Sequence, residues 1–336
     1  MKVLKYLAIG LILLIAAAFV GSFFLSDKAH AERSIVIDRP PSVVFALLNS
    51  FQRFNEWSPW ADLDPKTQYE YSGTERGVGA KMAWTSTDPS VGSGKQEITA
   101  SKPNERVETL LDFGDQGKAN AYFQLTPEGK GTRVAWGFNS DLNGPIERLF
   151  GLIIPGMIGG DYEKGLAKLK PLAESLPNVD LTGVEAELTT EVATPAYAVA
   201  AEAGVDEASS TEVLTAAYGE IMAFMAANQI NQSGPVFTRI LSHADGKWRF
   251  EASIPVDRND VAGTGRIQAT QSFGGKAIRF KHLGSYDSLS KTHEQAHGWL
   301  AVNKLTEIGT RYEVYVSDPA TTPVDELLTQ ILVPIE

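Results

Sequence analysis

The sequence predicts an α+β protein in which an apolar N-terminal helix precedes two folded units of antiparallel strands and helices. Three observations lead to this prediction. Residues 6–25 form an uncharged, almost wholly apolar run. A strand and a proline-led helix then introduce a series of short alternating strands, and in the C-terminal half an order of strand, helix and strands repeats once. The 336 residues leave room for two domains of ordinary size.

The composition argues against nucleic acid as a partner and against any site that depends on cysteine. The formal net charge of −11 argues against nucleic acid as a partner, because binding to phosphates requires clustered Lys and Arg side chains. The chain has no cysteine, which excludes disulfides, thiolate metal ligands and cysteine nucleophiles. No cofactor is expected.

The run from Tyr6 to Leu25 has the length and composition of a membrane-spanning helix, since such a run is about 30 Å long at 1.5 Å per residue. Lys2 and Lys5 precede it, so the positive-inside rule predicts a single-pass protein with a cytoplasmic N-terminus and an extracytoplasmic, periplasmic remainder. A cleaved signal peptide is the alternative, because Ala29-His30-Ala31 matches a small-x-small cleavage site. The protein would then be secreted. A buried helix of a cytosolic protein is a third interpretation.

The first folded unit is expected over residues 32–175, after an anchor at 1–31. Ser34–Asp38 is typical of a strand, and Pro40-Pro41 suits the start of a helix, where a missing N–H costs no hydrogen bond. Ser42 is the expected N-cap of that helix, and two tryptophans around Ser58-Pro59 then form a rigid turn. Strands are predicted at 68–72, 79–86, 94–101, 106–113, 119–127 and 131–139, followed by a helix at 146–174 that is broken near Pro155-Gly156 and Gly159-Gly160.

The second folded unit is expected over residues 185–336, after a linker at 176–184 that contains Pro, Asn, Asp and Gly. Ser209 or Ser210 is the expected cap of its first helix. The predicted order is strands at 185–190 and 197–201, a helix at 211–228, strands at 235–241, 248–255, 266–273 and 276–283, a helix at 286–303, and strands at 311–316 and 328–334.

The proline-led helix, the turn Trp57-Ser58-Pro59-Trp60 and the closing helix around Gly165–Lys170 resemble the START-like SRPBCC superfamily of polyketide cyclases and dehydrases. The resemblance covers about residues 32–175. It implies a helix-grip fold, in which a curved sheet grips a long C-terminal helix around an apolar cavity. The candidate residues for binding a flat, apolar or lipid-like ligand there are Trp57, Trp60, Trp84 and Trp136. The competing interpretation is that these rings are ordinary core. No catalytic motif of the superfamily carries over.

The segments Arg311–Pro319 and Ile331–Ile335, and the approach His282–Tyr286 into a helix, resemble the GyrI-like effector-binding domain of bacterial transcription activators. The resemblance covers about residues 185–336. It implies a duplicated half-sheet and two helices around a groove for small molecules, often cationic or aromatic, with Glu313 facing that groove. Many relatives adjoin a DNA-binding helix-turn-helix, and this chain has none, which argues against a role as a transcription factor.

A partly buried carboxylate at Glu313 could hold a cation, because its negative charge and the faces of neighbouring aromatic rings both attract positive charge. Alternation places Glu313 and Tyr315 on one face of the strand, opposite Tyr312. The other candidate ligand-binding residues are Tyr286 and Trp299. The competing interpretation is that Glu313 faces solvent.

The segment His293-Glu294-Gln295-Ala296-His297 matches the H-E-x-x-H pattern. On a helix this pattern puts two imidazoles one turn apart, with a glutamate as general base for zinc-bound water. The usual continuation with a third histidine is absent, and only Glu307 and Glu313 are conceivable replacements. A metal site at His293 and His297 is therefore the minor alternative. The main interpretation is a chance match on an amphipathic helix.

The residues together favour a membrane-anchored binding protein with two cradles for small molecules, which are apolar, lipid-like or aromatic cations. The alternatives are an enzyme, either cyclase- or hydrolase-like in the first cavity or a zinc hydrolase at His293 and His297, and a structural or assembly partner of the cell envelope. The sequence does not identify the ligand, the oligomeric state or any cooperation between the two units.

Overall fold

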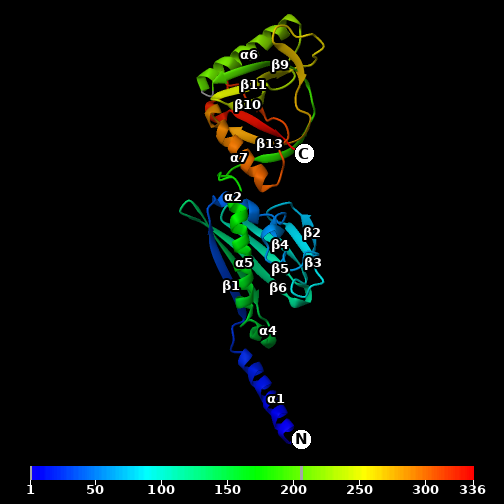
Figure 1. Cartoon of the computed structure of the whole chain (residues 1–336), viewed down its shortest axis with the longest axis vertical. Helices are drawn as coiled ribbons and strands as arrows, with labels where there is room; N and C mark the ends of the chain where they lie inside the picture. The colour runs from blue at the N-terminus through cyan, green and yellow to red at the C-terminus, as the bar shows by residue number, and fades with distance from the viewer. Residues whose placement is uncertain (1, 205–206) are drawn as a thin grey trace. The chain divides into compact units, whose positions relative to one another are not determined.

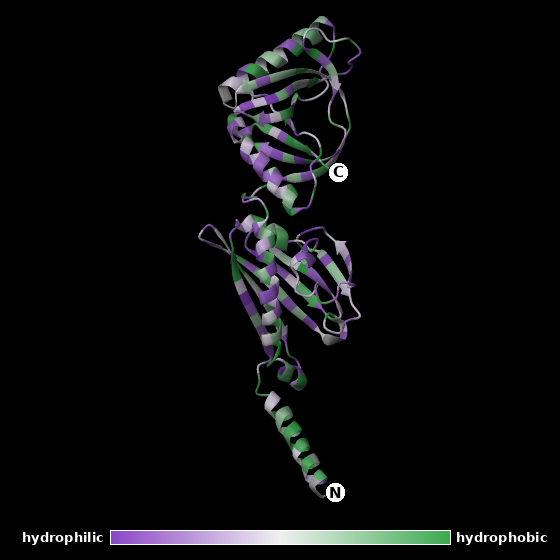
Figure 2. Ribbon diagram, viewed as in Figure 1, coloured by the Kyte–Doolittle hydropathy of each residue, from purple (hydrophilic) through white to green (hydrophobic). Residues whose placement is uncertain are grey.

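The computed structural model describes residues 2–204 and 207–336, which divide into two compact units, Met1–Thr182 and Gly183–Glu336 (Figure 1). Each unit contains one antiparallel sheet with helices, so the predicted α+β class is confirmed. Helix α1 (Lys2–Ser22) opens the first unit. Its segment Leu4–Ser22 is long and apolar enough to cross a membrane, and it is coloured as hydrophobic along most of its length in Figure 2.

The first unit is built on a seven-stranded sheet in the order β1-β7-β6-β5-β4-β3-β2. Successive strands from β2 to β7 are neighbours, and β1 pairs with β7 at one edge of the sheet. Their bounds are β1 (Lys28–Ile37), β2 (Gln68–Gly73), β3 (Ala80–Thr85), β4 (Ser93–Lys102), β5 (Arg106–Asp112), β6 (Lys118–Glu128) and β7 (Gly131–Asp141).

Strand β1 starts ahead of residue 32, the expected beginning of the first unit. Lys28 already pairs with Asp141 on β7, and the pairing continues to the end of the strand. Ala29 and Ala31 are buried, whereas His30 between them is exposed. This alternation is that of a strand with one face on a core. The segment Ala29-His30-Ala31, which also fits a cleavage site, is therefore part of the sheet.

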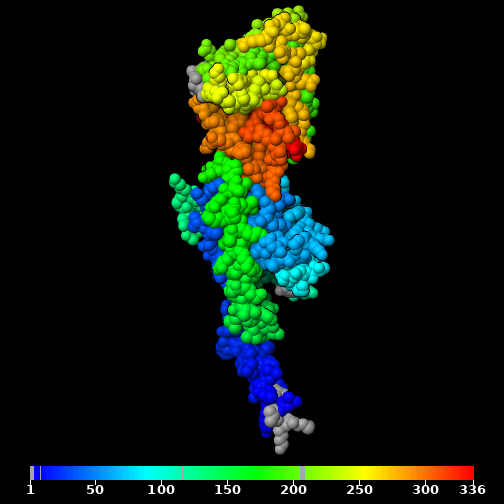
Figure 3. Space-filling model, in the orientation of Figure 1, coloured from blue at the N-terminus to red at the C-terminus, as the bar shows by residue number. Residues whose placement is uncertain are grey.

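Four helices accompany this sheet: α2 (Pro41–Leu48), α3 (Phe54–Trp57), α4 (Pro145–Phe150) and α5 (Ile154–Glu174). Helix α5 is the long closing helix of the predicted helix-grip arrangement; it packs on β1 and crosses one face of the unit in Figure 3. The expected break near Pro155 is the start of α5, where a proline fits the first turn. The break expected at Gly159-Gly160 is wrong, because the helix is continuous there.

The predicted cap role of Ser42 is also wrong. Helix α2 begins at Pro41, with Pro40 in the cap position, and this order suits the fixed φ of proline. The Ser42 hydroxyl instead donates to Asp180 Oδ1 at 2.8 Å and accepts from the Leu181 N–H at 2.8 Å. Ser42 therefore ties α2 to the segment that follows α5.

The second unit is built on an eight-stranded sheet in the order β12-β9-β11-β10-β14-β15-β13-β8. Two similar halves, each of two strands, a helix and two strands, exchange their first strands: β8 pairs with β13, and β12 pairs with β9. The bounds are β8 (Ala186–Glu191), β9 (Pro195–Gly204), α6 (Glu207–Ala227), β10 (Phe237–Ala244), β11 (Lys247–Pro255), β12 (Ile267–Gln271), β13 (Gly275–Leu283), α7 (Leu289–Val302), β14 (Tyr312–Tyr315) and β15 (Leu328–Pro334).

Helix α6 begins before the predicted caps. Ser209 lies within its first turn, and the Ser209 hydroxyl accepts a hydrogen bond from the Gly204 N–H at 2.9 Å. Residues 205 and 206, which precede the helix, lie outside the described part of the chain. The Ser209 hydroxyl therefore satisfies a backbone N–H at the end of β9.

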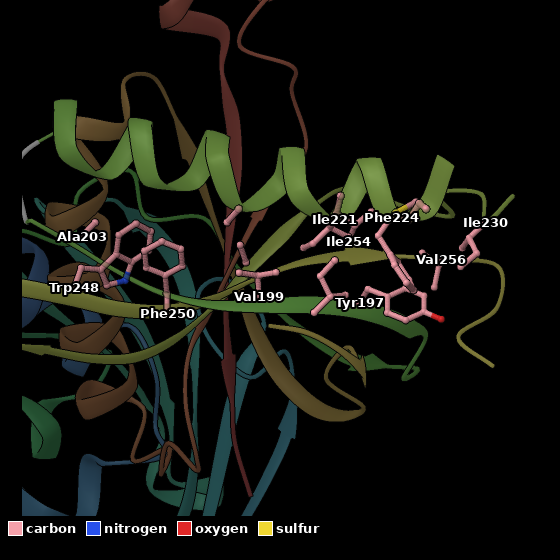
Figure 4. Packing of buried hydrophobic residues seen from close by; sticks show 14 residues of the cluster. Tyr197, Val199, Ala203, Ile221, Phe224, Ile230, Trp248, Phe250, Ile254 and Val256 are labelled. Carbon is pink, nitrogen blue, oxygen red and sulfur yellow. The ribbon is translucent and has the colours of Figure 1, made fainter. Parts of the chain in front are cut away.

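Two apolar cores fix the helices to the sheet. Beneath α6 lie rings and aliphatic side chains of β9 and β11, with Trp248 and Phe250 at one end of the cluster and Tyr197 at the other in Figure 4. Beneath α7 lie side chains of β13 and β15, among them Phe280 and Ile331. Cross-strand pairing through β10 and β14 connects the two cores.

Candidate ligand site around Glu313

One row of side chains runs across the middle of the second sheet. Ala252 on β11 pairs with Thr238 on β10, Thr238 pairs with Glu313 on β14, and Glu313 pairs with Ile331 on β15. Directly opposed residues of antiparallel strands point to the same face. Ala252 belongs to the core beneath α6 and Ile331 to the core beneath α7, so both helices cover the face that carries Glu313.

Glu313 is buried, with an exposed fraction of 6%. The interpretation that it faces solvent is therefore wrong. Its Oε2 accepts a hydrogen bond from the Tyr315 hydroxyl at 2.7 Å and a longer one from the Thr238 hydroxyl at 3.4 Å. Its Oε1 lies 2.8 Å from Nε2 of His293 on α7. A buried carboxylate is tolerated only with such partners.

Arg311 orients the imidazole of His293. The guanidinium Nη1 donates to the His293 carbonyl at 2.9 Å and lies 3.4 Å from Nδ1 of the same ring. Because a guanidinium only donates, we assign the lone pair to Nδ1 and the proton to Nε2, which donates to Glu313. Arg311 is itself paired with Glu307 at 2.7 Å.

The pKa values of the cluster follow from burial and from the charge of Glu313. Burial alone would raise the pKa of Glu313, but the hydrogen bond and charge of His293 and the hydrogen bond from Tyr315 outweigh it, so the pKa lies below 4.5. Burial and the nearby carboxylate raise the pKa of the Tyr315 and Tyr218 hydroxyls well above 10. Burial lowers the pKa of His243. Glu313 is therefore ionised at neutral pH.

Four buried polar atoms in the described part of the second unit have no hydrogen-bond partner: Tyr218 Oη on α6, Trp248 Nε1 on β11, Thr329 Oγ1 on β15 and Arg239 Nε on β10. The first three belong to the helix-covered face. The Trp248 ring stacks on His243 with centroids 6.0 Å apart, and Thr329 pairs across the strands with Tyr315. Because buried polar groups are normally satisfied, this part of the unit has unused hydrogen-bonding capacity close to a buried charge.

The structure brings some of the predicted ligand-binding residues of the second unit together and separates others. Tyr315 bonds to Glu313, and the Tyr286 ring lies edge-on to Tyr315 with centroids 5.7 Å apart. Trp299 packs edge-on against Phe280 in the core beneath α7, with centroids 5.6 Å apart. Sequence reasoning did not assign His293, Thr238 and Tyr218 to this group.

The H-E-x-x-H segment does not gather around an ion in this structure. His293 is directed at Glu313, whereas Glu294 and His297 are exposed. Across residues 2–204 and 207–336, no group of three His, Asp or Glu side chains has a metal-binding arrangement. Within this segment His293 therefore acts as a hydrogen-bond partner of the buried carboxylate.

The tryptophans predicted for the first unit pack mostly against one another. Trp136 stacks on Tyr162 of α5 with centroids 3.8 Å apart, and both Trp57 and Trp60 lie edge-on to Trp136, at 5.3 and 5.9 Å. Trp84 lies elsewhere, edge-on to Phe113 at 5.9 Å. A cavity of about 220 Å³ adjoins β2 and β3, and none of these four tryptophans lines it.

A second cavity, of about 230 Å³, lies on the opposite face of the second sheet from Glu313. Its walls include Phe237, Phe273, Tyr312 and Val314. Tyr312 and Val314 alternate with Glu313 and Tyr315 along β14, which places them on the face away from α6 and α7. The sheet thus separates an aromatic hollow from the buried carboxylate.

Comparison with known proteins gives the same division of the chain. Residues 28–174 match a family model described as polyketide cyclase / dehydrase and lipid transport, and residues 194–336 match the GyrI-like small molecule binding domain. A search of curated proteins finds no match.

Several solved structures match part of the chain. The cryo-EM structure of an EcmrR–DNA complex is 19% identical, with a TM-score of 0.42, and the match covers 46% of this chain and 57% of that chain. The crystal structure of the EcmrR C-terminal domain is 18% identical, covering 46% and 99%, with a TM-score of 0.42. A hydrolase from Listeria innocua is 13% identical, covering 45% and 92%, with a TM-score of 0.35. By its two family models, the chain joins a polyketide cyclase-like domain to a GyrI-like small-molecule-binding domain.

Proposed function

We propose that the second unit binds a small aromatic cation at Glu313, and that α1 anchors the protein in a membrane with both units outside the cytoplasm. The observation that carries the first part is a buried, ionised carboxylate on the helix-covered face of the sheet, which accepts hydrogen bonds from the Tyr315 and Thr238 hydroxyls and lies 2.8 Å from His293 Nε2. Burying an ionised carboxylate is costly. A bound cation would offset part of that cost.

The aromatic preference of the proposed site follows from the rings that lie near Glu313. Tyr315 and Tyr286 lie edge-on to each other, and Tyr218 is close enough for the charge of Glu313 to raise the pKa of its hydroxyl. Ring faces attract cations, and the attraction is stronger where water is excluded. The unpartnered Tyr218 and Trp248 groups would add hydrogen bonds to a ligand with polar substituents.

The first unit is proposed to hold an apolar or lipid-like molecule. Its support is the matched family, whose description includes lipid transport. The rings of Trp57, Trp60 and Trp136 pack on one another, so binding between the sheet and α5 would require these rings to move apart. This requirement makes the second unit the better first target for experiment.

A binding measurement with a charged probe and a neutral one tests the proposed site. Full-length protein in detergent is titrated with ethidium, a fluorescent aromatic cation, and with phenanthridine, which has a similar ring system and is neutral at pH 7.5. We expect ethidium to bind more tightly than phenanthridine. Glu313→Gln should weaken ethidium binding at least about tenfold, because a hydrogen bond or ion pair to a buried charge is worth about 1.5–3 kcal/mol.

The matched control is Glu251→Gln. Glu251 lies on the neighbouring strand β11 and pairs with Arg239 at 2.8 Å, and the register places it on the face away from the helices. Its substitution should leave ethidium binding unchanged. Equal affinity of wild type and Glu313→Gln for ethidium would contradict the proposal.

The membrane part of the proposal has a separate test. Protease added to intact spheroplasts should degrade both folded units, because the proposed orientation leaves only the first residues of the chain in the cytoplasm. Protection of the units in intact spheroplasts, followed by degradation after lysis, would refute the proposed orientation.

A further inference from the structure

An exposed apolar surface marks the junction between α4 and α5. We call it the apolar lobe and define it as Ile146, Phe150, Leu152, Ile153 and Met157. The exposed fractions of these side chains lie between 53% and 66%. Helix α4 carries hydrophobic colouring in Figure 2. Soluble proteins rarely leave so many large apolar side chains exposed side by side, and such patches usually contact a partner or a membrane.

The lobe has an amphipathic arrangement. Ile146 and Phe150 are four residues apart on α4, so they share one side of the helix, whereas Glu147 and Arg148 project from another. Ile153 and Met157 repeat this spacing at the start of α5. The apolar side chains thus form one surface with charged groups beside it, as in helices that lie in the interface of a bilayer.

The lobe adjoins the end of α1. Helix α4 contacts α1, and the Arg148 guanidinium donates to the Phe23 carbonyl at 3.1 Å. Phe23 and Phe24, directly after α1, are 57% and 87% exposed. The apolar surface of α1 therefore continues through the two phenylalanines to the lobe.

This continuity identifies the partner. The large apolar side chains described along α1, among them Leu4, Leu11 and Phe19, are exposed, as expected of a helix whose partner is hydrocarbon rather than protein. Because α4 contacts the same helix, a bilayer that takes up α1 also reaches the lobe. Arg148, bonded at the end of α1, lies at the level expected for a headgroup contact.

We propose that the apolar lobe inserts into the surface layer of the bilayer that α1 crosses. The first unit is then held by a spanning helix and by an interfacial wedge, and the beginning of α5 lies against lipid. This inference rests on the proposed membrane insertion of α1, and the experiment below separates the two.

The natural absence of cysteine makes single-site labelling direct. Nitroxide labels are attached to Phe150→Cys and Met157→Cys in the lobe, to Leu11→Cys in α1 as a bilayer marker, and to Val78→Cys as an aqueous control. Val78 and Phe150 are matched, since both are 56% exposed on the first unit. The full-length protein is reconstituted in phosphatidylcholine vesicles, and collision rates with O2 and with a water-soluble nickel chelate are measured.

Oxygen concentrates in the bilayer and the nickel chelate stays in water. We expect the ratio of oxygen to nickel collisions at positions 150 and 157 to exceed the ratio at position 78 at least threefold, and to lie below the ratio at position 11. If the lobe labels gave the same collision ratio as position 78 while position 11 gave a bilayer ratio, the inference would be overturned and the proposed anchor would stand. An aqueous label at position 11 would refute the proposed anchor itself. Shielding of the lobe labels from both reagents would mean that a second copy of the chain covers the lobe, which also overturns the inference.

Discussion

Nε2 of His293 and Oε1 of Glu313 lie 2.8 Å apart, joining helix α7 to the centre of the second sheet. His293 belongs to a segment with a zinc-binding pattern, and Glu313 belongs to a strand that resembles an effector-binding motif. In this contact the histidine provides a hydrogen-bond partner for the buried carboxylate. Arg311 in turn holds the His293 ring in place.

His293→Ala should destabilise the second unit. The substitution removes a hydrogen bond to a buried carboxylate, so we expect the free energy of unfolding at pH 7 to fall by about 1–3 kcal/mol. The loss should be smaller below the lowered pKa of Glu313, where protonation of the carboxylate removes the buried charge. Urea unfolding followed by circular dichroism measures both values. His297→Ala, one turn along the same helix and exposed, is the control and should change stability by less than about 0.5 kcal/mol.

Stability should decline in acid through two groups of the same cluster. The pKa of Glu313 is lower in the folded chain than its usual 4.5, so its contribution is present above that value and is lost as the pH falls through the folded pKa. Burial lowers the pKa of His243 below 6.5, so the unfolded chain takes up its proton first, and stability also falls as the pH drops below 6.5. Unfolding free energies from pH 8 to pH 3 test this slope. In Glu313→Gln the loss of unfolding free energy below about pH 4.5 should be smaller than in the wild type. An equal loss in both proteins would exclude Glu313 as its source.

Two glycines of α5 should respond oppositely to alanine. A Cβ at Gly165 would lie 2.7 Å from a ring carbon of Trp136 and 3.0 Å from Pro59, so Gly165→Ala should cost about 1–3 kcal/mol through overpacking. A Cβ at Gly160 would meet nothing within 4 Å. Gly160→Ala should therefore raise stability by about 0.5–1 kcal/mol through helix propensity. Thermal unfolding of the two variants provides the comparison, and equal effects would show that α5 is not packed tightly on the tryptophans.

Removal of residues 28–31 should weaken the first unit. These residues pair with 138–141 of β7, and Ala29 and Ala31 are buried. A chain that starts at Glu32 should be less stable than one that starts at Asp27 by about 1–3 kcal/mol, because it loses ladder hydrogen bonds and apolar burial. Cleavage after Ala31 would produce the shorter chain, so we predict that the intact mass of the protein from membranes includes the N-terminal helix. A mass that begins at Glu32 would establish the signal-peptide alternative.

Local patterns were sufficient for most of the fold. The strands predicted to begin at Gln68 and at Leu328 do begin at those residues. Alternation also placed Glu313 and Tyr315 on one face, and the hydrogen bond between them confirms this placement. Such patterns succeed where a segment's own side chains determine its structure.

The features that sequence reasoning missed depend on distant partners. Ser42 has the chemistry of a helix cap, but its partners Asp180 and Leu181 lie far along the chain. His293 donates to a residue on another element, which the H-E-x-x-H spacing does not reveal. Helical periodicity places Trp299 inward but does not distinguish Glu313 from Phe280 as its neighbour.

Strand β14 has only four residues, yet it joins β10 on one side and β15 on the other. It is therefore the seam between the two halves of the second sheet, and Glu313 lies within it. A molecule that binds this carboxylate therefore contacts the short strand that holds the two halves of the sheet together. Its binding should slow amide hydrogen exchange in the flanking strands β10 and β15, whichever of the surrounding rings it contacts.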